Sequence, residues 1–305
     1  MFELTTPVAL IIFNRPDKTK KVFEQIRNAK PSKLLIIADG ARSNVAGEDK
    51  LCKEVKSIVE NVDWDCTVFK DYATENLGCK DRPTTGLKWV FEHTDKAIIL
   101  EDDCLPHPSF FQYCQKLLEH YKDDERVNII SGSNFFSELS DKKESYYFSI
   151  FHHFWGWATW KRSWENFDIE MINWPKLKVK HYIEGIVKHK QSAKYWETLF
   201  DEVYTNKLSN AWDYQWIYSS WINYGVAIIP SNNLISNIGF GEDATHTKDP
   251  RNIRSNVRAE GIEFPLIHPA KVERNVGADM HEAETLFRFK GRERIIRYIK
   301  NILGI

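Results

Sequence analysis

The first 130 residues alternate short apolar runs, rich in β-branched residues, with longer stretches in which apolar positions recur at helical spacing. The apolar runs predict strands at residues 8–13, 34–38, 66–69, 97–100 and 127–131. A helix is expected after each of the first four strands. This alternation predicts an α/β fold in which a mainly parallel, Rossmann-like sheet is flanked by helices. Ligands bind such sheets beyond the carboxyl ends of the strands, so polar residues directly after strands are the ones to examine.

Four amphipathic helices are expected between these strands. Their apolar stripes are Val22, Phe23, Ile26 and Ala29; Leu51, Val55, Ile58, Val59 and Val62; Leu87, Val90 and Phe91; and Phe110, Cys114, Leu117, Leu118 and Tyr121. The third helix is predicted over residues 84–93, because Pro83 is favoured at a helix start rather than in its interior. Each stripe is expected to be buried against the sheet.

From about residue 141 the regular alternation ends, and a Trp-rich stretch with long irregular connections follows. No linker rich in Pro, Gly or Ser separates the two parts, and the chain shows no internal repeat. We therefore expect residues 1–135 and 136–270 to be two halves of one domain, and residues 271–305 to be a helical tail.

Composition and charge exclude several classes of protein. The 305 residues, 42% of them hydrophobic, can bury a full core. Lys and Arg total 42 against 43 Asp and Glu, and this balance gives no general attraction to nucleic acid. Residues 1–13 have no basic region, and their apolar run is too short for a signal peptide or a membrane span, so we expect a cytoplasmic protein. The five cysteines lack the spacing of a zinc site, and we expect reduced thiols.

Three carboxylates, Glu101, Asp102 and Asp103, stand directly after the apolar run at residues 97–100. Adjacent anions repel one another, so a pocket that holds them together usually contains a cation. We expect Asp103 to bind a divalent ion, Mn²⁺ or Mg²⁺, and Asp102 to touch it through water. Such an ion could neutralise a diphosphate leaving group. The alternative is a solvated acidic turn that caps the following helix.

The segment over residues 99–113, ILEDDCLPHPSFFQY, resembles the acidic EDD segment of GT-A glycosyltransferases, particularly N-acetylglucosaminyltransferase I and its bacterial relatives. The resemblance extends over the βα half and continues beyond it only as scattered motifs. It implies a GT-A fold in which the first half binds a nucleotide sugar, with uridine as the preferred base, and the second half binds the acceptor. It also implies that Asp103 contacts the metal, that Asp102 lies near the ribose, and that Glu101 organises a nearby basic side chain.

Other residues at strand ends fit the same arrangement. Asn14 and Arg15 follow the first strand, where one of them is expected to contact base or phosphate. Asp39 follows the second strand and, by resemblance, matches the acidic residue that GT-A enzymes use against base or ribose. A turn-forming Asp-Gly pair is the alternative role for Asp39.

The stretch over residues 75–82, ENLGCKDR, resembles the NxG stretch that precedes the third helix in many GT-A transferases. Gly78 would let the backbone approach the donor closely. Arg82 and Lys80 are candidates either for phosphate contact or for pairing with Glu101.

The second half contains Trp155, Gly156 and Trp157, which resemble the acceptor-side WGW segment of bacterial GT-A enzymes. A glycine between two rings would let the backbone pass close to a ligand that the rings flank. Packing of the second half is the alternative for at least two of the three tryptophans in this segment, which also contains Trp160.

Asp213 stands among aromatic residues at the predicted start of an apolar helix that runs to Trp221. An acceptor hydroxyl is a poor nucleophile, and a carboxylate that takes its proton would help the transfer. We therefore predict that Asp213 is the base, with Glu165 and Asp168 as other candidates. The alternative role for Asp213 is a helix N-cap. By resemblance, the reaction is a direct displacement that inverts the anomeric configuration.

Two further segments are candidates for ligand contact. Residues 236–247 form a Gly-rich polar stretch that could close over a donor, and His246 within it could contact the metal or the diphosphate. Residues 286–305 form a basic amphipathic stretch, which predicts a helix. Such a helix can lie on an anionic bilayer at the inner face of a membrane, dock on its own domain, or bind a second subunit.

These expectations favour a metal-dependent glycosyltransferase that moves a sugar from a nucleotide diphosphate donor to a glycan or lipid-linked acceptor. A sugar nucleotidyltransferase would also use acidic metal ligands, but the first strand leads into Asn14-Arg15-Pro16 rather than the Gly-rich basic loop that holds a triphosphate. A non-catalytic glycan-binding protein would use the tryptophans and leave the acidic triplet unexplained.

Overall fold

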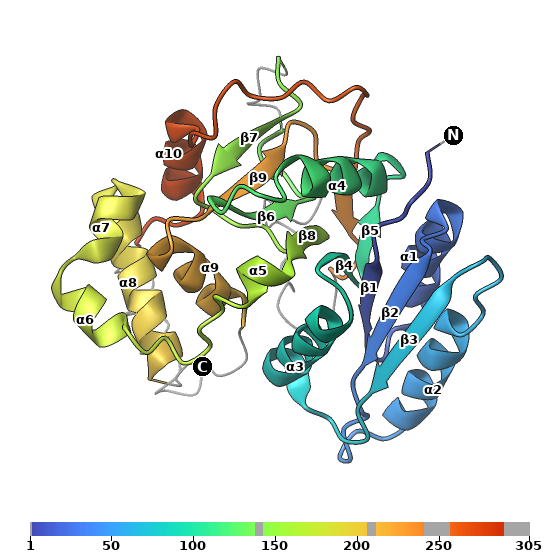
Figure 1. Cartoon of the computed structure of the whole chain (residues 1–305). Helices are drawn as coiled ribbons and strands as arrows, with labels where there is room; N and C mark the ends of the chain where they lie inside the picture. The colour runs from blue at the N-terminus through green and yellow to red at the C-terminus, as the bar shows by residue number, and fades with distance from the viewer. Residues whose placement is uncertain (1, 138–142, 206–211, 241–256, 290–305) are drawn as a thin grey trace.

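The chain is built on an eight-stranded sheet, described by a computed structural model over residues 2–137, 143–205, 212–240 and 257–289. The strand order in this part of the chain is β3-β2-β1-β4-β8-β6-β9-β7 (Figure 1). The strands are β1 (Val8–Ile12), β2 (Lys33–Ala38), β3 (Thr67–Tyr72), β4 (Lys96–Glu101), β6 (Val127–Ser131), β7 (Tyr146–Ser149), β8 (Trp157–Trp160) and β9 (Val226–Pro230). All point the same way except β7 and β8. The predicted mainly parallel, Rossmann-like α/β sheet is confirmed.

Helices cover both faces of this sheet (Figure 1). One face packs against α1 (Pro16–Ala29), α2 (Glu48–Val59) and α4 (Ser109–His120). The other packs against α3 (Gly78–His93), α5 (Lys161–Trp164) and α9 (Asp213–Ile222). A further apolar cluster joins α9 to α6 (Trp174–Val179), α7 (Tyr182–Val187), α8 (Lys190–Tyr204) and α10 (Val276–Thr285).

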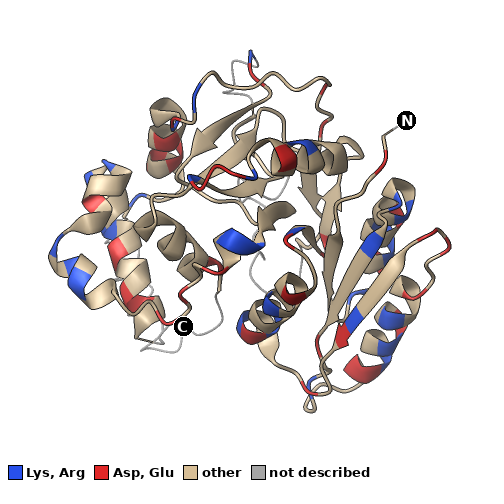
Figure 2. Cartoon of the chain, viewed as in Figure 1, with Lys and Arg blue, Asp and Glu red and all other residues tan. Residues whose placement is uncertain are grey.

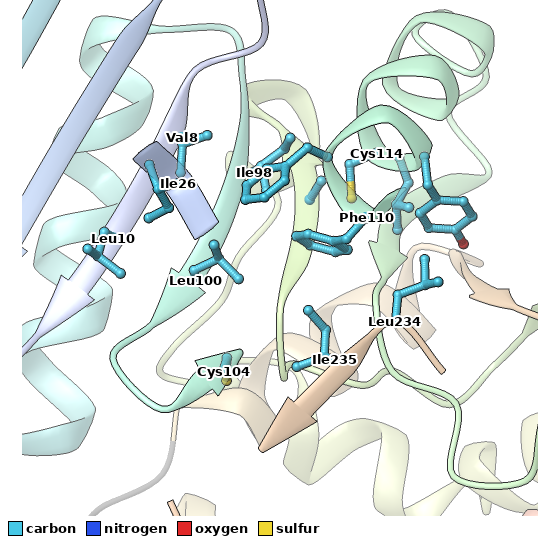
Figure 3. Packing of buried hydrophobic residues seen from close by; sticks show 14 of the residues in the cluster. Val8, Leu10, Ile26, Ile98, Leu100, Cys104, Phe110, Cys114, Leu234 and Ile235 are labelled. Carbon is cyan, nitrogen blue, oxygen red and sulfur yellow. The ribbon is translucent and has the colours of Figure 1, made fainter. Parts of the chain in front are cut away.

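Most strands of the first half are buried on both faces, whereas the edge strand β3 is only partly buried. Ile98 and Leu100 of β4 lie in one apolar cluster with Phe110 of α4 (Figure 3), whereas Ile99 between them lies in the layer that contacts α3. Strands covered on both sides are continuous apolar runs rather than alternating patterns. The five strands expected in the first half are all present, and their ends differ from the expected ones by at most three residues.

The third helix begins earlier than predicted. α3 starts at Gly78 instead of residue 84, and Pro83 lies inside it. The carboxylate of Asp39, at the end of β2, accepts hydrogen bonds from the backbone N–H groups of Leu77 and Gly78, both at 2.9 Å. This distant acceptor satisfies donors at the helix N-terminus and fixes the first turn ahead of the proline.

The buried face of α2 is shifted from the predicted stripe. Leu51 is 40% exposed, and the buried residues of this helix are Glu48, Cys52, Val55 and Val59. Leu51 is part of the predicted buried stripe because it is hydrophobic. The helix instead buries the acid Glu48, whose carboxylate is ion-paired with Arg42 at 2.5 Å.

A second, two-stranded sheet was not predicted. β5 (Cys104–Pro106) follows the acidic triplet directly and pairs antiparallel with β10 (Ile235–Asn237). Cys104 and Ile235 belong to the same buried cluster as α4 (Figure 3). This pairing fixes the segment after β10 beside the carboxyl end of β4.

The second half of the chain completes the same sheet rather than a separate one, because β7, β8 and β9 come from it. Lys and Arg are interspersed with Asp and Glu over the outer helices (Figure 2). The helix predicted over residues 286–305 lies mostly outside the described residues. Among the helices that are described, none is long and apolar enough to cross a bilayer.

Most tryptophans of the second half are packing residues. Trp174, Trp196 and Trp221 are almost fully buried in the cluster around α8 and α9. Aromatic rings bury large areas and favour tilted and edge-to-face contacts, as between Trp196 and Trp221, whose centroids are 5.0 Å apart at 67°. A high aromatic content thus serves the core of this half.

One polar side chain in this half is buried in its neutral form. His152 is 6% exposed, its ring stacks on Phe154, and neither ring nitrogen has a hydrogen-bond partner in the described part of the chain. Burial, with a smaller contribution from His153, lowers the pKa of His152 to about 3.

This lowered pKa predicts a loss of stability in mild acid. The unfolded chain takes up a proton at His152 below about pH 6.5 and the folded chain does so only near pH 3, so stability falls as the pH drops through this window. Between pH 7 and pH 5 the loss from this group is roughly 2 kcal/mol. His152→Phe should flatten the dependence of the free energy of unfolding on pH, measured by urea denaturation.

The matched control is His181→Phe, since the His181 side chain is exposed, with a relative accessibility of 77%. It should keep the wild-type dependence on pH. If His152→Phe kept it as well, the imidazole would not be buried as described.

Candidate functional site

Acidic residues from several elements lie near one another beyond the carboxyl ends of β2 and β4 and at the start of α9. Burial raises the pKa of the Cys79 thiol in the first turn of α3, and the charges of Glu101, Asp213 and Asp39 raise it further. These three acids come from β4, α9 and the end of β2. They therefore surround one site at this edge of the sheet.

The acidic triplet is held in place by the loop after β1. Asp102 is buried, and its Oδ2 accepts a hydrogen bond from the Phe13 N–H at 3.1 Å. Arg15 Nη1 lies 2.6 Å from Asp103 Oδ2 and 3.6 Å from Asp102 Oδ1. One guanidinium thus bridges two of the three carboxylates. Burial and repulsion from its neighbours, led by Asp103, raise the pKa of Asp102 to about 7, although Arg15 opposes the rise.

The pKa of Glu101 is raised in the same way. Burial raises its pKa to about 8, with repulsion from Asp103, Asp102 and Asp213 adding to the effect. Burial is the largest cause of both raised pKa values, and repulsion between neighbouring carboxylates is the next. The site therefore favours a further cation, or protons in its place.

A short segment after β10 lies directly over Asp103. The Ile238 N–H donates to the Asp103 carbonyl at 2.8 Å, and the Gly239 N–H donates to Asn237 Oδ1 at 2.7 Å. A Cβ atom on Gly239 would overlap Asp103 Oδ2. Only glycine leaves room for the carboxylate in this arrangement.

The same segment connects the acidic triplet with the Trp-rich half. Phe240 packs edge-to-face on Trp155, which is half-buried, with ring centroids 5.5 Å apart. Trp155 also contacts Phe135, at 5.1 Å. Trp155 is thus a partly accessible ring near the acidic site.

Trp157 has a different environment. It is 1% exposed and its ring packs against Trp212 and Trp216, each at 5.8 Å. Gly156, with φ +60°, faces Ile235 so closely that a side chain there would overlap it. Trp160 is buried too. Trp157 and Trp160 are therefore packing residues, which was the alternative role for two of the three tryptophans. The enclosed Trp157 ring has no exposed face with which it could contact an acceptor.

Asp39 organises the loop beside the site. Besides the Leu77 and Gly78 N–H groups, its carboxylate accepts hydrogen bonds from the Gly40 N–H at 2.8 Å and from Asn76 Nδ2 at 3.0 Å. Gly78 has φ +81°, which favours glycine, and open space where a side chain would stand. In the structure, Asp39 holds the start of α3. Contact of Asp39 or Gly78 with a nucleoside stays a prediction.

Asn14 faces a buried acid that the sequence did not single out. Asn14 Nδ2 donates to Glu48 Oε1 at 2.8 Å. Hydrogen bonds from Arg42 are the largest influence on Glu48, and they lower its pKa. A periodicity argument places polar residues on the outside of α2 and gives no signal for Glu48. The pair with Asn14 ties α2 to the loop that carries Arg15.

Arg82 pairs with a carboxylate other than Glu101. Its guanidinium donates to the Ala38 carbonyl at 3.1 Å and is ion-paired with Asp71 Oδ2 at 2.7 Å. The basic side chain beside the acidic triplet is Arg15. Arg82 therefore joins the ends of β2 and β3, and its contact with phosphate remains a prediction.

Asp213 is the first residue of α9, after Trp212, rather than the residue before the helix. The electric field of a helix N-terminus stabilises a carboxylate at this position. Its charge acts on Glu101 across the site. Asp168, one of the two other acids considered for the same role, accepts a hydrogen bond from the Ile172 N–H at 2.8 Å.

The sequence predicts Asp103 and His246 as metal ligands. In the described part of the chain, no group of three or more His, Cys, Asp and Glu residues could hold a metal ion by itself. His246 lies outside the described residues. All five cysteines lie in the described part of the chain, and none of them forms a disulfide bond.

Comparison with known proteins gives little. No family model and no curated protein matches the chain. Among solved structures, a cytidylyltransferase from Leptospira borgpetersenii serovar Hardjo-bovis is similar over 54% of this chain, at 13% identity and a TM-score of 0.32. A UDP-glucose pyrophosphorylase complexed with UDP-glucose is similar over 49%, at 12% identity and a TM-score of 0.27. The chain spans 64% of the length of each. Similarities this slight carry no argument about the reaction.

Proposed function

We propose that this protein transfers a sugar from a nucleotide diphosphate donor, with uridine as the expected base, to a hydroxyl group of a glycan or lipid-linked acceptor. The observation that carries the proposal is the site at the carboxyl edge of the sheet. There, Arg15 pairs with Asp102 and Asp103, and the charge of Asp213 of α9 acts on the neighbouring Glu101. Open α/β sheets bind their ligands at this edge.

The donor would lie along the ends of β1, β2 and β4. Arg15 is the cation nearest to the acidic triplet and can bind phosphate oxygens with its planar fork of N–H donors. The loop formed by Asp39, Asn76 and Gly78 would lie on the nucleoside side. Trp155, through Phe240, would border the acceptor side.

The residues present fit a divalent metal ion. Carboxylate oxygens are hard ligands, and Mg²⁺ is commonly held by one or two carboxylates, with substrate phosphates and water completing its coordination. Such a cation would relieve the repulsion among the neighbouring carboxylates of the triplet. Asp103 would hold the ion, which would neutralise charge on the departing diphosphate.

Asp213 would accept the proton of the acceptor hydroxyl. The bond between the anomeric carbon and the diphosphate oxygen breaks, a bond to the acceptor oxygen forms, and the proton passes to the Asp213 carboxylate. Attack opposite to the leaving group inverts the anomeric configuration. The carboxylates nearby would stabilise the positive charge that develops on the sugar ring.

Nucleotidyl transfer is the second candidate. The cytidylyltransferase and the pyrophosphorylase compared above belong by name to that class and not to the first. Their similarity is too slight to decide, so the assay must include both reactions. Nucleotidyl transfer joins a sugar phosphate to a nucleoside triphosphate and releases pyrophosphate, whereas glycosyl transfer releases a nucleoside diphosphate.

A panel of nucleotide sugars and nucleoside triphosphates, screened by thermal shift with and without Mn²⁺, tests the proposal. One nucleotide diphosphate sugar should raise the melting temperature of the wild type, and Mn²⁺ should increase the rise. Asp103→Ala should lose the Mn²⁺-dependent part. Asp213→Asn should keep donor binding and lose transfer by roughly 10²- to 10⁴-fold.

Asp81→Asn, on the exposed side of α3, is the matched control and should behave as wild type. Stabilisation by a triphosphate with release of pyrophosphate would favour nucleotidyl transfer instead. Undiminished transfer in Asp213→Asn would mean that another group takes the proton.

Gly239→Ala should impair the site without unfolding the protein. The added methyl group would overlap Asp103 Oδ2, so the carboxylate must leave its place beside Arg15. Mutation of a group that positions a metal ligand commonly costs roughly 10- to 100-fold in metal affinity, and donor binding with Mn²⁺ should weaken to that extent in calorimetry. Gly185→Ala, where a methyl group meets nothing within 4 Å, is the control. Equal affinities in the two variants would contradict the described packing.

A further inference from the structure

Arg15 has a fixed backbone and a side chain that reaches the acidic triplet. Its carbonyl accepts hydrogen bonds from the Thr19 N–H at 2.9 Å and the Thr19 hydroxyl at 2.8 Å, and Pro16 follows it at the start of α1. The side chain of Arg15 retains about a fifth of its accessible surface. The guanidinium can therefore change partners while its attachment to the loop stays in place.

The contact of Arg15 falls on the carboxylate that would hold the metal ion. Nη1 lies 2.6 Å from Asp103 Oδ2, and the Cys104 thiol lies 3.5 Å from Oδ1. Mg²⁺, for example, binds carboxylate oxygens at roughly 2.0–2.1 Å. At Oδ2 such an ion would stand close to the guanidinium, and the two cations would repel each other. Binding of the ion to Oδ2 therefore favours release of Arg15 from Asp103.

We infer that Arg15 acts as a latch, which closes Asp103 to divalent cations until a nucleotide diphosphate takes over the guanidinium. The inference rests on the proposed function and concerns the regulation of that site. In the nucleotide-free protein Arg15 balances Asp102 and Asp103. A diphosphate offers it oxygens in the paired geometry that guanidinium groups prefer.

Charge balance makes the two ligands depend on each other. A divalent ion alone adds positive charge beside Arg15, and a diphosphate alone adds negative charge beside the carboxylates. When both bind, their charges compensate and Arg15 keeps an anionic partner. Binding of one ligand must then strengthen binding of the other by the same factor, since coupling between two sites is reciprocal.

The test measures Mn²⁺ binding by electron paramagnetic resonance, which does not depend on turnover, with and without UDP. The wild type should bind Mn²⁺ roughly 5- to 100-fold more tightly in the presence of UDP. Arg15→Gln, which removes the charge, should bind Mn²⁺ about tenfold more tightly than the wild type in the absence of UDP, and the effect of UDP should shrink. Arg15→Lys keeps the charge and should keep nucleotide-free Mn²⁺ binding weak.

Arg42→Gln is the matched control, because Arg42 pairs with Glu48 instead of the triplet. It should bind Mn²⁺ as the wild type does. Unchanged or weaker nucleotide-free Mn²⁺ binding in Arg15→Gln would overturn the latch. So would equal Mn²⁺ affinities of the wild type with and without UDP.

The two ideas fail in different ways. Suppose that UDP-dependent Mn²⁺ binding is lost in Asp103→Ala but is unchanged in Arg15→Gln. This result would refute the latch and would be consistent with the proposed function. If Asp103→Ala bound Mn²⁺ and UDP as the wild type does, the proposed function would fail and the latch with it.

Discussion

Carboxyl groups crowd the end of β4, and the balance of their charge is the constraint on which the rest of the site depends. Glu101, Asp102 and Asp103 are consecutive and largely withdrawn from water, and the charge of Asp213 in α9 acts on Glu101. Arg15 supplies the positive charge that holds Asp102 and Asp103 together. Like charges are stable at such distances only when a cation or protons compensate them. A binding partner that brings positive charge is therefore favoured.

The fold builds this crowding from elements that are distant in the sequence. Parallel strands bring Arg15 and the triplet to one edge, although the two segments are 88 residues apart. The pairing of β5 with β10 then places Gly239 over Asp103, and Phe240 continues to Trp155. The same short segment thus encloses the acidic site and reaches the aromatic half. Ligand binding at one of these places is expected to affect the other.

The sequence revealed β1, β2, β4 and β6 because they are apolar runs buried on both faces, and it revealed the acidic triplet because three acids directly after an apolar strand are unusual. It could not show that Asp39 holds the start of α3, since helix periodicity carries no information on a capping group from another strand. Nor could it separate Trp155 from Trp157. The positive φ of Gly156 turns the chain between them, and only tertiary packing decides which ring is enclosed. The sequence also could not show that Arg15 pairs with Asp102 and Asp103, because this pairing depends on contacts between distant segments.

The central claim is that the acidic end of β4 seats a divalent cation beneath a diphosphate. Anomalous diffraction from crystals grown with Mn²⁺ and UDP tests it most directly. The account predicts a manganese peak at roughly 2.0–2.2 Å from an Asp103 oxygen, with oxygens of the diphosphate bound to the same ion. Manganese and UDP bound at another place, with the Asp103 carboxylate still paired to Arg15, would contradict it.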